Sequence, residues 1–289
     1  MGVLAVPLSR RVFALALLAC ATAAAAPSPQ RIISTSPSVT EILYGVGAFD
    51  RVVAVSEFCT YPPAVKNLPR VGKWADSNLE EIVSLHPDLV ILSTAQAPFL
   101  EDHLHHLGIR SLAVPDRTLS DVFTAIDLVG KATGHEAQAR DLLERVRTRL
   151  DAVRARTRGL PRRRVLLIVD RTPGTLHDLY AVTKGSFLAD LIDIAGGECV
   201  VAAAKIGYGK ISEEAVVDLK PDIIIDFVHG STGRFAENSR AVWGDLPELE
   251  AVRSGRVYPV NNEFLPHPSQ FVADTAELFA GIIHPEAGR

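Results

Sequence analysis

Short runs of continuous apolar residues alternate along this chain with segments whose apolar residues recur at helical spacing. The run Leu89-Val-Ile-Leu92 leaves no polar residue on either face, which is typical of a parallel strand covered on both sides. Alternation of such strands with helices implies right-handed crossovers and a parallel sheet, so the sequence predicts an α/β fold. The expected strands are 31–34, 52–55, 89–92, 111–114, 165–169 and 256–260, and the expected helices include 79–85, 99–107, 186–195 and one from about 268.

The pattern of the stretch 70–92 recurs at 208–226. Each copy contains an aromatic residue, a Ser with acidic residues, an apolar helix, a Pro-Asp pair and an apolar strand. The residues that superpose are Pro87 with Pro221, Glu80 with Glu214 and Trp74 with Tyr208. A chain that builds one unit twice is expected to have two similar halves with its function between them.

One long helix is expected between the halves. Residues 136–158 contain apolar residues at helical spacing and neither Gly nor Pro, which predicts an uninterrupted helix of ~30 Å. Such a connection resists large hinge closure, because hinge motion needs loop residues to absorb the dihedral change. The expected fold is therefore two Rossmann-like lobes with central parallel sheets, joined by a single long rigid helix. The expected divisions are a signal peptide 1–26, an N-terminal lobe 27–134, the connecting helix 135–159 and a C-terminal lobe 160–289.

Local signals predict where several helices begin and end. Ser38 with Glu41 three residues later is typical of a capping box. Asn78 or Ser77 is expected to cap the next helix, and Gly196-Gly197 indicates a helix stop.

The first 26 residues are typical of a secretory signal peptide. They combine Arg10 and Arg11 with a short apolar core and a small-residue cleavage region near Ala26. The apolar run is shorter than the ~20 residues that a spanning helix needs, so we expect an exported protein rather than one anchored by this segment as a membrane-spanning helix. A second interpretation is a lipobox at 17–20, in which Cys20 would carry a lipid anchor. The later cysteines, Cys59 and Cys199, are expected to be free thiols.

Charge and motif content exclude several classes of function. The formal net charge is −4, and the basic residues are scattered apart from Arg162 to Arg164, which we interpret as a solvated strand entrance. Without a basic patch interleaved with aromatics, no nucleic-acid binding is expected. The sequence also contains no nucleophile elbow, P-loop or dinucleotide fingerprint, so we expect neither catalysis nor a resident cofactor.

Histidines and a cysteine offer a few candidate metal ligands. His103, His105 and His106 could bind a metal through the His103 and His106 pair, but such a cluster is more often an exposed helix face, and we expect no metal site. His177 and His267 lie in expected cleft loops and could supply axial or polar contacts to a ligand. Cys59 is either a soft ligand or, more commonly, a small buried hydrophobe.

Aromatic residues gather on the loops that follow the predicted strands, where open parallel sheets bind ligands. Large flat side chains on loops of both halves suit a broad, largely apolar ligand held by stacking. The alternative for each residue is that it fills the interior of its own lobe. The loop aromatics are Phe58, Tyr61, Trp74, Tyr180, Tyr208 and Phe264.

Glu80 and Glu214 begin equivalent helices of the repeat. They could complement the helix dipoles, each contributing ~0.5 kcal/mol. They could instead form two matched points of charge for docking a basic partner, and the pattern alone leaves both interpretations open.

From Arg31 onward the chain resembles the periplasmic vitamin B12-binding proteins of ABC importers, within the helical-backbone (class III) substrate-binding family. The motifs that carry the resemblance are Ser36-Pro-Ser-Val-Thr-Glu41, Tyr61-Pro-Pro63, Trp74 with Asn78-Leu-Glu80, Leu85-x-Pro87-Asp88 and Gly196-Gly-Glu198. The resemblance implies two lobes that move little and a corrin ring gripped by cleft aromatics. The positions onto which this grip carries over are Phe58, Trp74, Tyr180 and Tyr208, followed by Glu263 and Phe264.

The resemblance also implies a partner. Two glutamates in this class engage arginines of the permease, and they fall on Glu80 and Glu214. The expected partners are thus an inner-membrane permease and ATPase complex, with the binding protein acting as a monomer. One departure is Ser93, which stands where the family has a tryptophan after the strand.

The expected function is capture of cobalamin or a related corrinoid and its delivery to an ABC importer. The alternative within the class is haem or a ferric siderophore, and from another class a metal-chelate enzyme on a chelatase-like fold. The residues that could ligate iron in the first alternative are Tyr61, Tyr180, Tyr208, His177 and His267.

Overall fold

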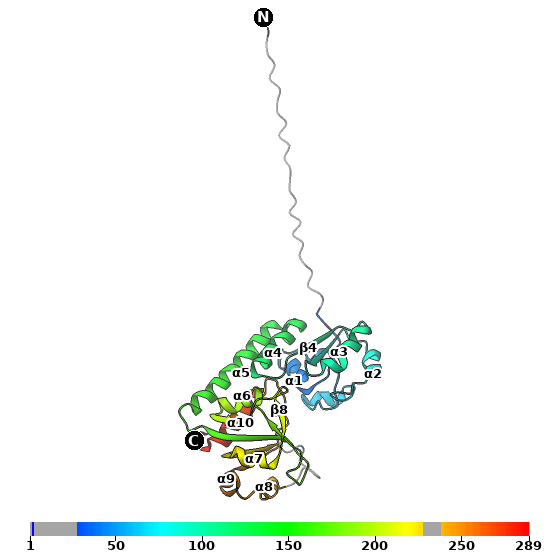
Figure 1. Cartoon of the computed structure of the whole chain (residues 1–289). Coiled ribbons are helices and arrows are strands. Elements are labelled where there is room, and N and C mark those ends of the chain that lie inside the picture. Colours follow the sequence, from blue (N-terminus) through cyan, green and yellow to red (C-terminus); the bar gives the residue numbers. More distant parts are fainter. Residues whose placement is uncertain (1, 3–27, 228–237, 289) are drawn as a thin grey trace.

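The computed structural model describes residues 2, 28–227 and 238–288. Two α/β lobes are joined by one long helix, α5 (Glu136–Thr157), and Figure 1 shows this helix running along one side of both lobes. The expected signal peptide, with the candidate anchor Cys20, lies outside the described residues apart from Gly2. Within the described part of the chain, no helix is both long and apolar enough to cross a membrane.

The N-terminal lobe is built on a four-stranded, fully parallel sheet with the strand order β2-β1-β3-β4. Its elements are β1 (Ile32–Ser34), α1 (Pro37–Gly45), η1 (Phe49–Arg51), β2 (Val52–Val55), η2 (Pro63–Asn67), α2 (Leu79–Ser84), β3 (Leu89–Ser93), α3 (Ala97–His106), β4 (Ser111–Val114) and α4 (Leu119–Thr133). Both faces of β3 are buried: Leu89 and Ile91 join one hydrophobic cluster, while Val90 and Leu92 join another. This explains the uninterrupted apolar run, since period-2 side chains alternate between two covered faces.

The C-terminal lobe carries a six-stranded mixed sheet, ordered β10-β9-β5-β6-β8 with β7 also paired to β5. Its elements are β5 (Arg163–Asp170), β6 (Leu179–Val182), α6 (Phe187–Ile194), β7 (Gly197–Cys199), β8 (Tyr208–Ile211), α7 (Glu213–Leu219), β9 (Ile223–Phe227), α8 (Ser239–Trp243), α9 (Glu250–Arg253), β10 (Val257–Val260), α10 (Val272–Ile283) and η4 (Pro285–Gly288). Strands β10, β9 and β5 run parallel, as expected, and β7, which the sequence analysis did not predict, is parallel to β5. Strand β6 is antiparallel to both of its neighbours, β5 and β8. The short loop 171–178 explains the reversed direction of β6, because a parallel return needs a crossover of a dozen or more residues.

The α5 helix buries the stripe of apolar residues that its sequence predicts. It packs against α4 on one side and α10 on the other, and Arg149 of α5 forms ion pairs with Asp274 and Glu277 of α10. One hydrophobic cluster continues from the N-terminal sheet through α5 into the C-terminal lobe. The buried stripe consists of Leu142, Leu143, Val146, Leu150 and Val153. The connection is therefore a packed helix rather than a flexible linker, while the residue-by-residue division of the lobes stays a prediction.

Two helix starts test the capping predictions. Asn78 caps α2 as expected, its side chain accepting a hydrogen bond from the Glu81 backbone N–H at 3.1 Å. The capping box at Ser38 is wrong: Ser36 is the cap of α1, and its hydroxyl accepts from the Val39 backbone N–H. Glu41 is buried and uses its carboxylate for a distant partner instead of the helix start.

Both described cysteines are free thiols, as predicted. Burial raises the pKa of Cys59 and of Cys199, so neither is a ready nucleophile or thiolate ligand. Cys59 packs in the core of its lobe, which fits the interpretation as a small hydrophobe.

Candidate functional site

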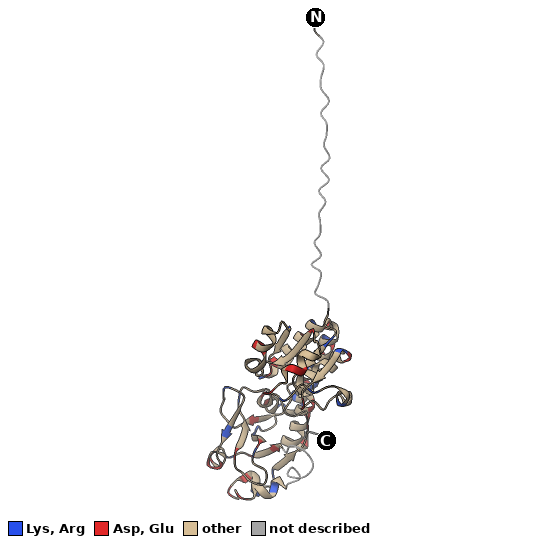
Figure 2. Ribbon diagram, turned by 90° about the vertical axis from the view of Figure 1, so that its right-hand side faces the viewer, with Lys and Arg blue, Asp and Glu red and all other residues tan. Residues whose placement is uncertain are grey.

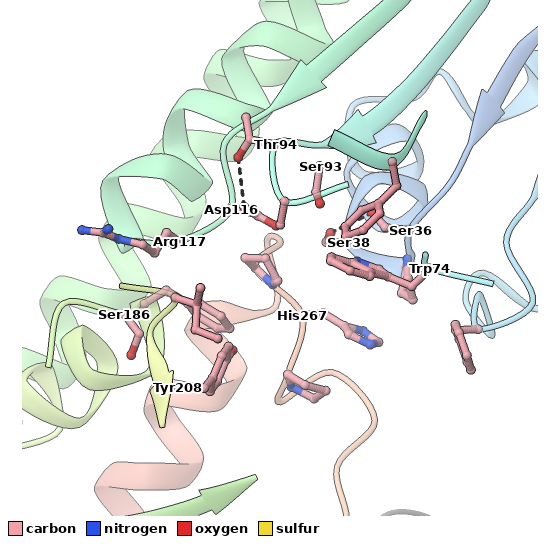
Figure 3. Close-up of a pocket in the computed structure, with 18 of the residues that line it drawn as sticks. Ser36, Ser38, Trp74, Ser93, Thr94, Asp116, Arg117, Ser186, Tyr208 and His267 are labelled. Carbon is pink, nitrogen blue, oxygen red and sulfur yellow. Dashed lines mark hydrogen bonds between the residues drawn. The ribbon is translucent and has the colours of Figure 1, made fainter. Parts of the chain in front are cut away.

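A cleft of about 870 Å³ lies between the lobes. It is formed by the loops that follow β3 and β4, the starts of α1 and α6, the segment before β8, and the crossing segment 266–268 (Figure 3). Its position at the carboxyl ends of parallel strands is the usual place for ligands in open α/β sheets. The lining residues are Ser36, Pro37, Ser38, Phe58, Trp74, Ser93, Thr94, Ala95, Pro98, Phe99, Asp116, Arg117, Ser186, Phe187, Lys205, Ile206, Tyr208, Pro266, His267 and Pro268.

Exposed apolar side chains line much of this cleft. Trp74 is 40% exposed and lies 5.9 Å from Phe99 between ring centroids, while Phe58 is 53% exposed. Ile206 and Tyr208 line the cleft from the C-terminal lobe. Apolar surface left open in a concave site is typical of a ligand-binding site.

The position of Trp74 is fixed by a buried amide. Gln96 is fully buried, and its Nε2 donates hydrogen bonds to the backbone oxygens of Trp74, at 2.9 Å, and Thr35, at 3.0 Å. Its Oε1 accepts from the Thr35 hydroxyl and from the Ser93 backbone N–H. The loop that carries Trp74 is thus tied to the ends of β1 and β3.

A group of polar side chains lies where β3 and β4 end. Asp116 accepts a hydrogen bond from the Thr94 hydroxyl at 3.2 Å (Figure 3). Burial raises the pKa of Asp116, and the nearby hydroxyls of Ser93 and Thr94 oppose this shift without outweighing it. The Ser93 hydroxyl is buried and has no hydrogen-bond partner among the described residues. These groups can accept and donate hydrogen bonds to polar substituents of a ligand.

Two basic residues form the rim where the lobes meet. Arg117 donates to the backbone oxygen of Lys205 at 3.3 Å, and the Phe187 backbone N–H donates to the Arg117 backbone oxygen at 2.7 Å. Both Arg117 and Lys205 are exposed. The cleft therefore combines apolar walls, a half-buried acid and a cationic edge.

The crossing segment brings a histidine to the cleft. His267 Nδ1 lies 2.7 Å from Glu41 Oε1, and the other carboxylate oxygen accepts a hydrogen bond from the Ser269 hydroxyl. The side chain of Glu41 is 1% exposed and that of His267 is 18% exposed. This contact ties the C-terminal segment to α1.

Three of the predicted ligand residues line the cleft: Phe58, Trp74 and Tyr208. Trp74 and Tyr208, which the repeat aligns, thus line one cavity from opposite lobes. Burial, with a smaller contribution from the Asp116 charge, raises the pKa of Tyr208 to about 12.

Four other predicted residues lie away from this lining. Tyr61 and Phe264 pack in an aromatic cluster with Phe271, with Phe264 stacked on Phe271 at 4.0 Å. Tyr180 is an exposed residue of β6, and exposed Glu263 accepts a hydrogen bond from the Thr60 hydroxyl at 3.1 Å.

The other candidate histidines also lie outside the cleft. His177 is exposed, 3.9 Å from Glu213. His103, His105 and His106 are exposed on the last turns of α3. Among the residues that the structure describes, no three His, Cys, Asp or Glu side chains gather so as to hold a metal ion.

Glu80 and Glu214 are exposed in the first turns of α2 and α7, one in each lobe. Hydrogen bonds from the Ser212 hydroxyl and from its own backbone lower the pKa of Glu214, so this carboxylate is charged at neutral pH. Figure 2 shows acidic and basic residues spread over both lobes.

The sequence predictions missed the polar part of the cleft. Ser93, Thr94 and Asp116 follow predicted strands, so the same rule that selected the loop aromatics could have selected them. Arg117 and Lys205 carried no comparable signal, because scattered surface cations look alike in a sequence.

Comparison with known proteins identifies several relatives of this chain. A family described as "Periplasmic binding protein" matches residues 32–263. The curated relatives include the uncharacterized ABC transporter substrate-binding lipoprotein YvrC of Bacillus subtilis, 29% identical over 89% of this chain and 81% of its own. A vitamin B12-binding protein of Yersinia pestis is 30% identical over 86% of this chain and 84% of its own.

Solved structures show a similar set of relatives. The periplasmic vitamin B12 binding protein BtuF of Vibrio cholerae has 26% identity and a TM-score of 0.76, covering 90% of this chain and 98% of its own. A periplasmic heme binding protein from Pseudomonas aeruginosa has 24% identity and a TM-score of 0.76, covering 89% and 93%, which is a likeness of fold alone.

Proposed function

The chain belongs to the periplasmic binding protein family, whose members are substrate-binding proteins of ABC transporters, and on that premise we propose that its cleft binds a corrinoid. The ligand would be cobalamin or a related cobamide, delivered to an inner-membrane permease and ATPase complex. The vitamin B12-binding relatives support this choice.

The observation that carries the proposal is the composition of the cleft. Trp74 and Phe58 from one lobe and Tyr208 from the other line a single large cavity. A corrin is a broad ring whose edge carries methyl groups and amide side chains. Its faces suit aromatic contacts, and its neutral amides can pair with the hydroxyls of Ser93 and Thr94.

Asp116 favours neutral ligand substituents over anionic ones. Its carboxyl is half-buried beside Thr94, and a carboxylate of a ligand placed next to it would be repelled once Asp116 is charged. An amide N–H can instead donate a hydrogen bond to it. This supports a corrinoid over haem, which carries two propionates.

Haem is the second candidate ligand, and the exposed cations Arg117 and Lys205 at the rim are the observation that favours it. The tyrosines that were expected to ligate haem iron do not support haem as the ligand. Tyr61 and Tyr180 lie outside the cleft lining, and the raised pKa of Tyr208 opposes coordination as a tyrosinate.

Isothermal titration calorimetry with cyanocobalamin, and separately with haemin, tests the proposal. We expect saturable one-to-one binding of cyanocobalamin at micromolar concentration or below. Saturable binding of haemin together with no heat change for cyanocobalamin would refute the corrinoid assignment and support haem.

We further propose that Glu80 and Glu214 dock the importer. Each lobe presents one exposed carboxylate on a capped first helical turn, and cationic side chains of a permease would complement this pair. Export would depend on residues 1–26, whether cleaved as a signal peptide or retained through a lipid on Cys20. The lipoprotein relative makes the second route worth testing by mass spectrometry of the mature protein.

A further inference from the structure

His267 is oriented by a buried carboxylate of the opposite lobe. Its Nδ1 lies 2.7 Å from Glu41 Oε1, while Glu41 Oε2 accepts a hydrogen bond from the Ser269 hydroxyl. With both of its oxygens accepting, the carboxylate takes the Nδ1–H of the imidazole as a donor. In the neutral ring the other nitrogen, Nε2, then keeps its lone pair.

The Nε2 side of the ring faces the cleft. His267 lines the cavity with 18% of its side chain exposed, whereas the Glu41 side chain beside Nδ1 is 1% exposed. In the view of Figure 3 the imidazole lies below the indole of Trp74. Within residues 28–227 and 238–288, His267 makes its side-chain hydrogen bond through Nδ1 alone. An open lone pair thus lies in a cavity that we have proposed to hold a metal-centred ring.

The backbone around His267 is held in place. Pro266 and Pro268 flank it, and each has a fixed φ. The His267 backbone N–H donates to the Phe264 oxygen at 3.0 Å, and the His267 oxygen accepts from Ser269 at 2.9 Å. A ligand held on such a segment loses little freedom when it binds.

We propose, resting on the corrinoid assignment, that His267 Nε2 is an axial ligand to the cobalt of the bound corrinoid, with Glu41 as its positioning residue. The Nε2 lone pair would bond to Co(III), one coordinated water would leave to solvent, and no electron would be transferred. The Nδ1 proton stays on the hydrogen bond to Glu41. A carboxylate that orients a histidine in this way is the usual support of a metal-binding imidazole.

The proposal defines a preference among corrinoids. Those with an exchangeable axial water, such as diaquocobinamide, gain the bond to His267. Those whose axial positions are filled by cyanide, such as dicyanocobinamide, do not. The cleft would therefore select corrinoids by their axial chemistry as well as by the shape of their ring.

The test is visible absorption spectroscopy of diaquocobinamide with purified full-length protein. Wild type should shift the cobinamide bands to the positions that free imidazole produces. In His267→Ala the bound cobinamide should keep its diaquo spectrum, and added imidazole should restore the shifted bands. His177→Ala, which removes an exposed histidine outside the cleft, is the matched control and should behave as wild type.

Glu41→Gln tests the positioning role. It should weaken diaquocobinamide binding by ~10- to 100-fold, the usual effect of losing an outer carboxylate partner of a metal ligand. Because Glu41 is buried, circular dichroism is used to check that Glu41→Gln folds. If this variant does not fold, the axial-ligand proposal is tested by His267→Ala with added imidazole.

The outcomes separate the two proposals. Binding of both cobinamides by wild type with no spectral shift, or a shift that persists in His267→Ala, would overturn the axial-ligand proposal and leave the corrinoid function standing. Failure of both cobinamides and of cyanocobalamin to bind would overturn the function, and the axial ligand with it.

Discussion

Replacing Trp74 by Ala removes the largest aromatic side chain that lines the cleft. Gln96 holds the Trp74 backbone independently of the indole, so the loop should keep its place. Trp74 is 40% exposed without ligand, which is the part of its surface that a ligand can cover. The change should therefore act on binding far more than on folding.

The magnitude follows from that surface. A Trp side chain of ~250 Å² that is 40% exposed leaves ~100 Å² to be covered, equivalent to ~2.5 kcal/mol at ~25 cal/mol per Å². Incomplete coverage lowers this value, so we expect a loss of ~1 to 3 kcal/mol, the range of an aromatic hot spot. At ~1.4 kcal/mol for each factor of ten, the dissociation constant should rise ~5- to 150-fold.

Calorimetric titration of wild type and Trp74→Ala with cyanocobalamin measures the effect. The control is Leu107→Ala, at the end of α3, which removes a 50% exposed apolar side chain outside the cleft and should leave affinity unchanged. An unaltered dissociation constant for a folded Trp74→Ala protein would refute the role of this side chain.

Three further variants test docking, electrostatics and the core. The double variant Glu80→Ala with Glu214→Ala should bind cyanocobalamin normally yet fail to stimulate its importer's ATPase in liposomes; full stimulation would exclude docking through these carboxylates. Asp116→Asn should raise the melting temperature at pH 7, because the raised pKa means that the folded state holds this proton more tightly than the unfolded chain. The wild-type protein thus loses stability as pH rises from the ordinary Asp pKa of 3.8 through the pKa of Asp116 in the folded state. The gain in melting temperature from Asp116→Asn should therefore vanish below pH 3.8. An equal gain at pH 7 and below pH 3.8 would contradict this account. Asp226→Ala leaves the guanidinium of Arg171 buried without its 2.8 Å partner, and urea titration should show a loss of ~3 to 5 kcal/mol; a loss below ~1 kcal/mol would mean that the pair is not buried as described.

The sequence was most informative where burial repeats with a regular period. The apolar stripe of α5 and the uninterrupted run of β3 both follow from covered faces, and both were predicted correctly. The repeat also brought Trp74 and Tyr208 to one cavity, because equivalent loops of similar lobes occupy equivalent places.

Predictions failed where a distant residue competes with a local rule. Glu41 fits a capping box with Ser38 locally, but its carboxylate bonds to His267, 226 residues further along the chain. Phe264 looked like a cleft aromatic but stacks on Phe271 and contacts Tyr61 of the other lobe. Neither set of contacts can be predicted from hydrophobic periodicity or from helix and strand propensity, since both depend on how the lobes meet.

The antiparallel strands β6 and β8 were missed for a related reason. The sequence around Tyr208 matched a loop in the first copy of the repeat, whereas the C-terminal lobe pairs it with β6 at Val182. A similar pattern in two halves thus predicted the position of the aromatic side chain better than the backbone that carries it.

The central claim is that a corrinoid binds between Trp74 and Tyr208, and the most direct measurement is the crystal structure of the complex grown with cyanocobalamin. Anomalous scattering from cobalt locates the metal without reference to any expected pose. The account predicts one strong cobalt peak inside the cleft between the two lobes. A cleft without cobalt in crystals grown at saturating cyanocobalamin, or a cobalt peak elsewhere on the molecule, would contradict it.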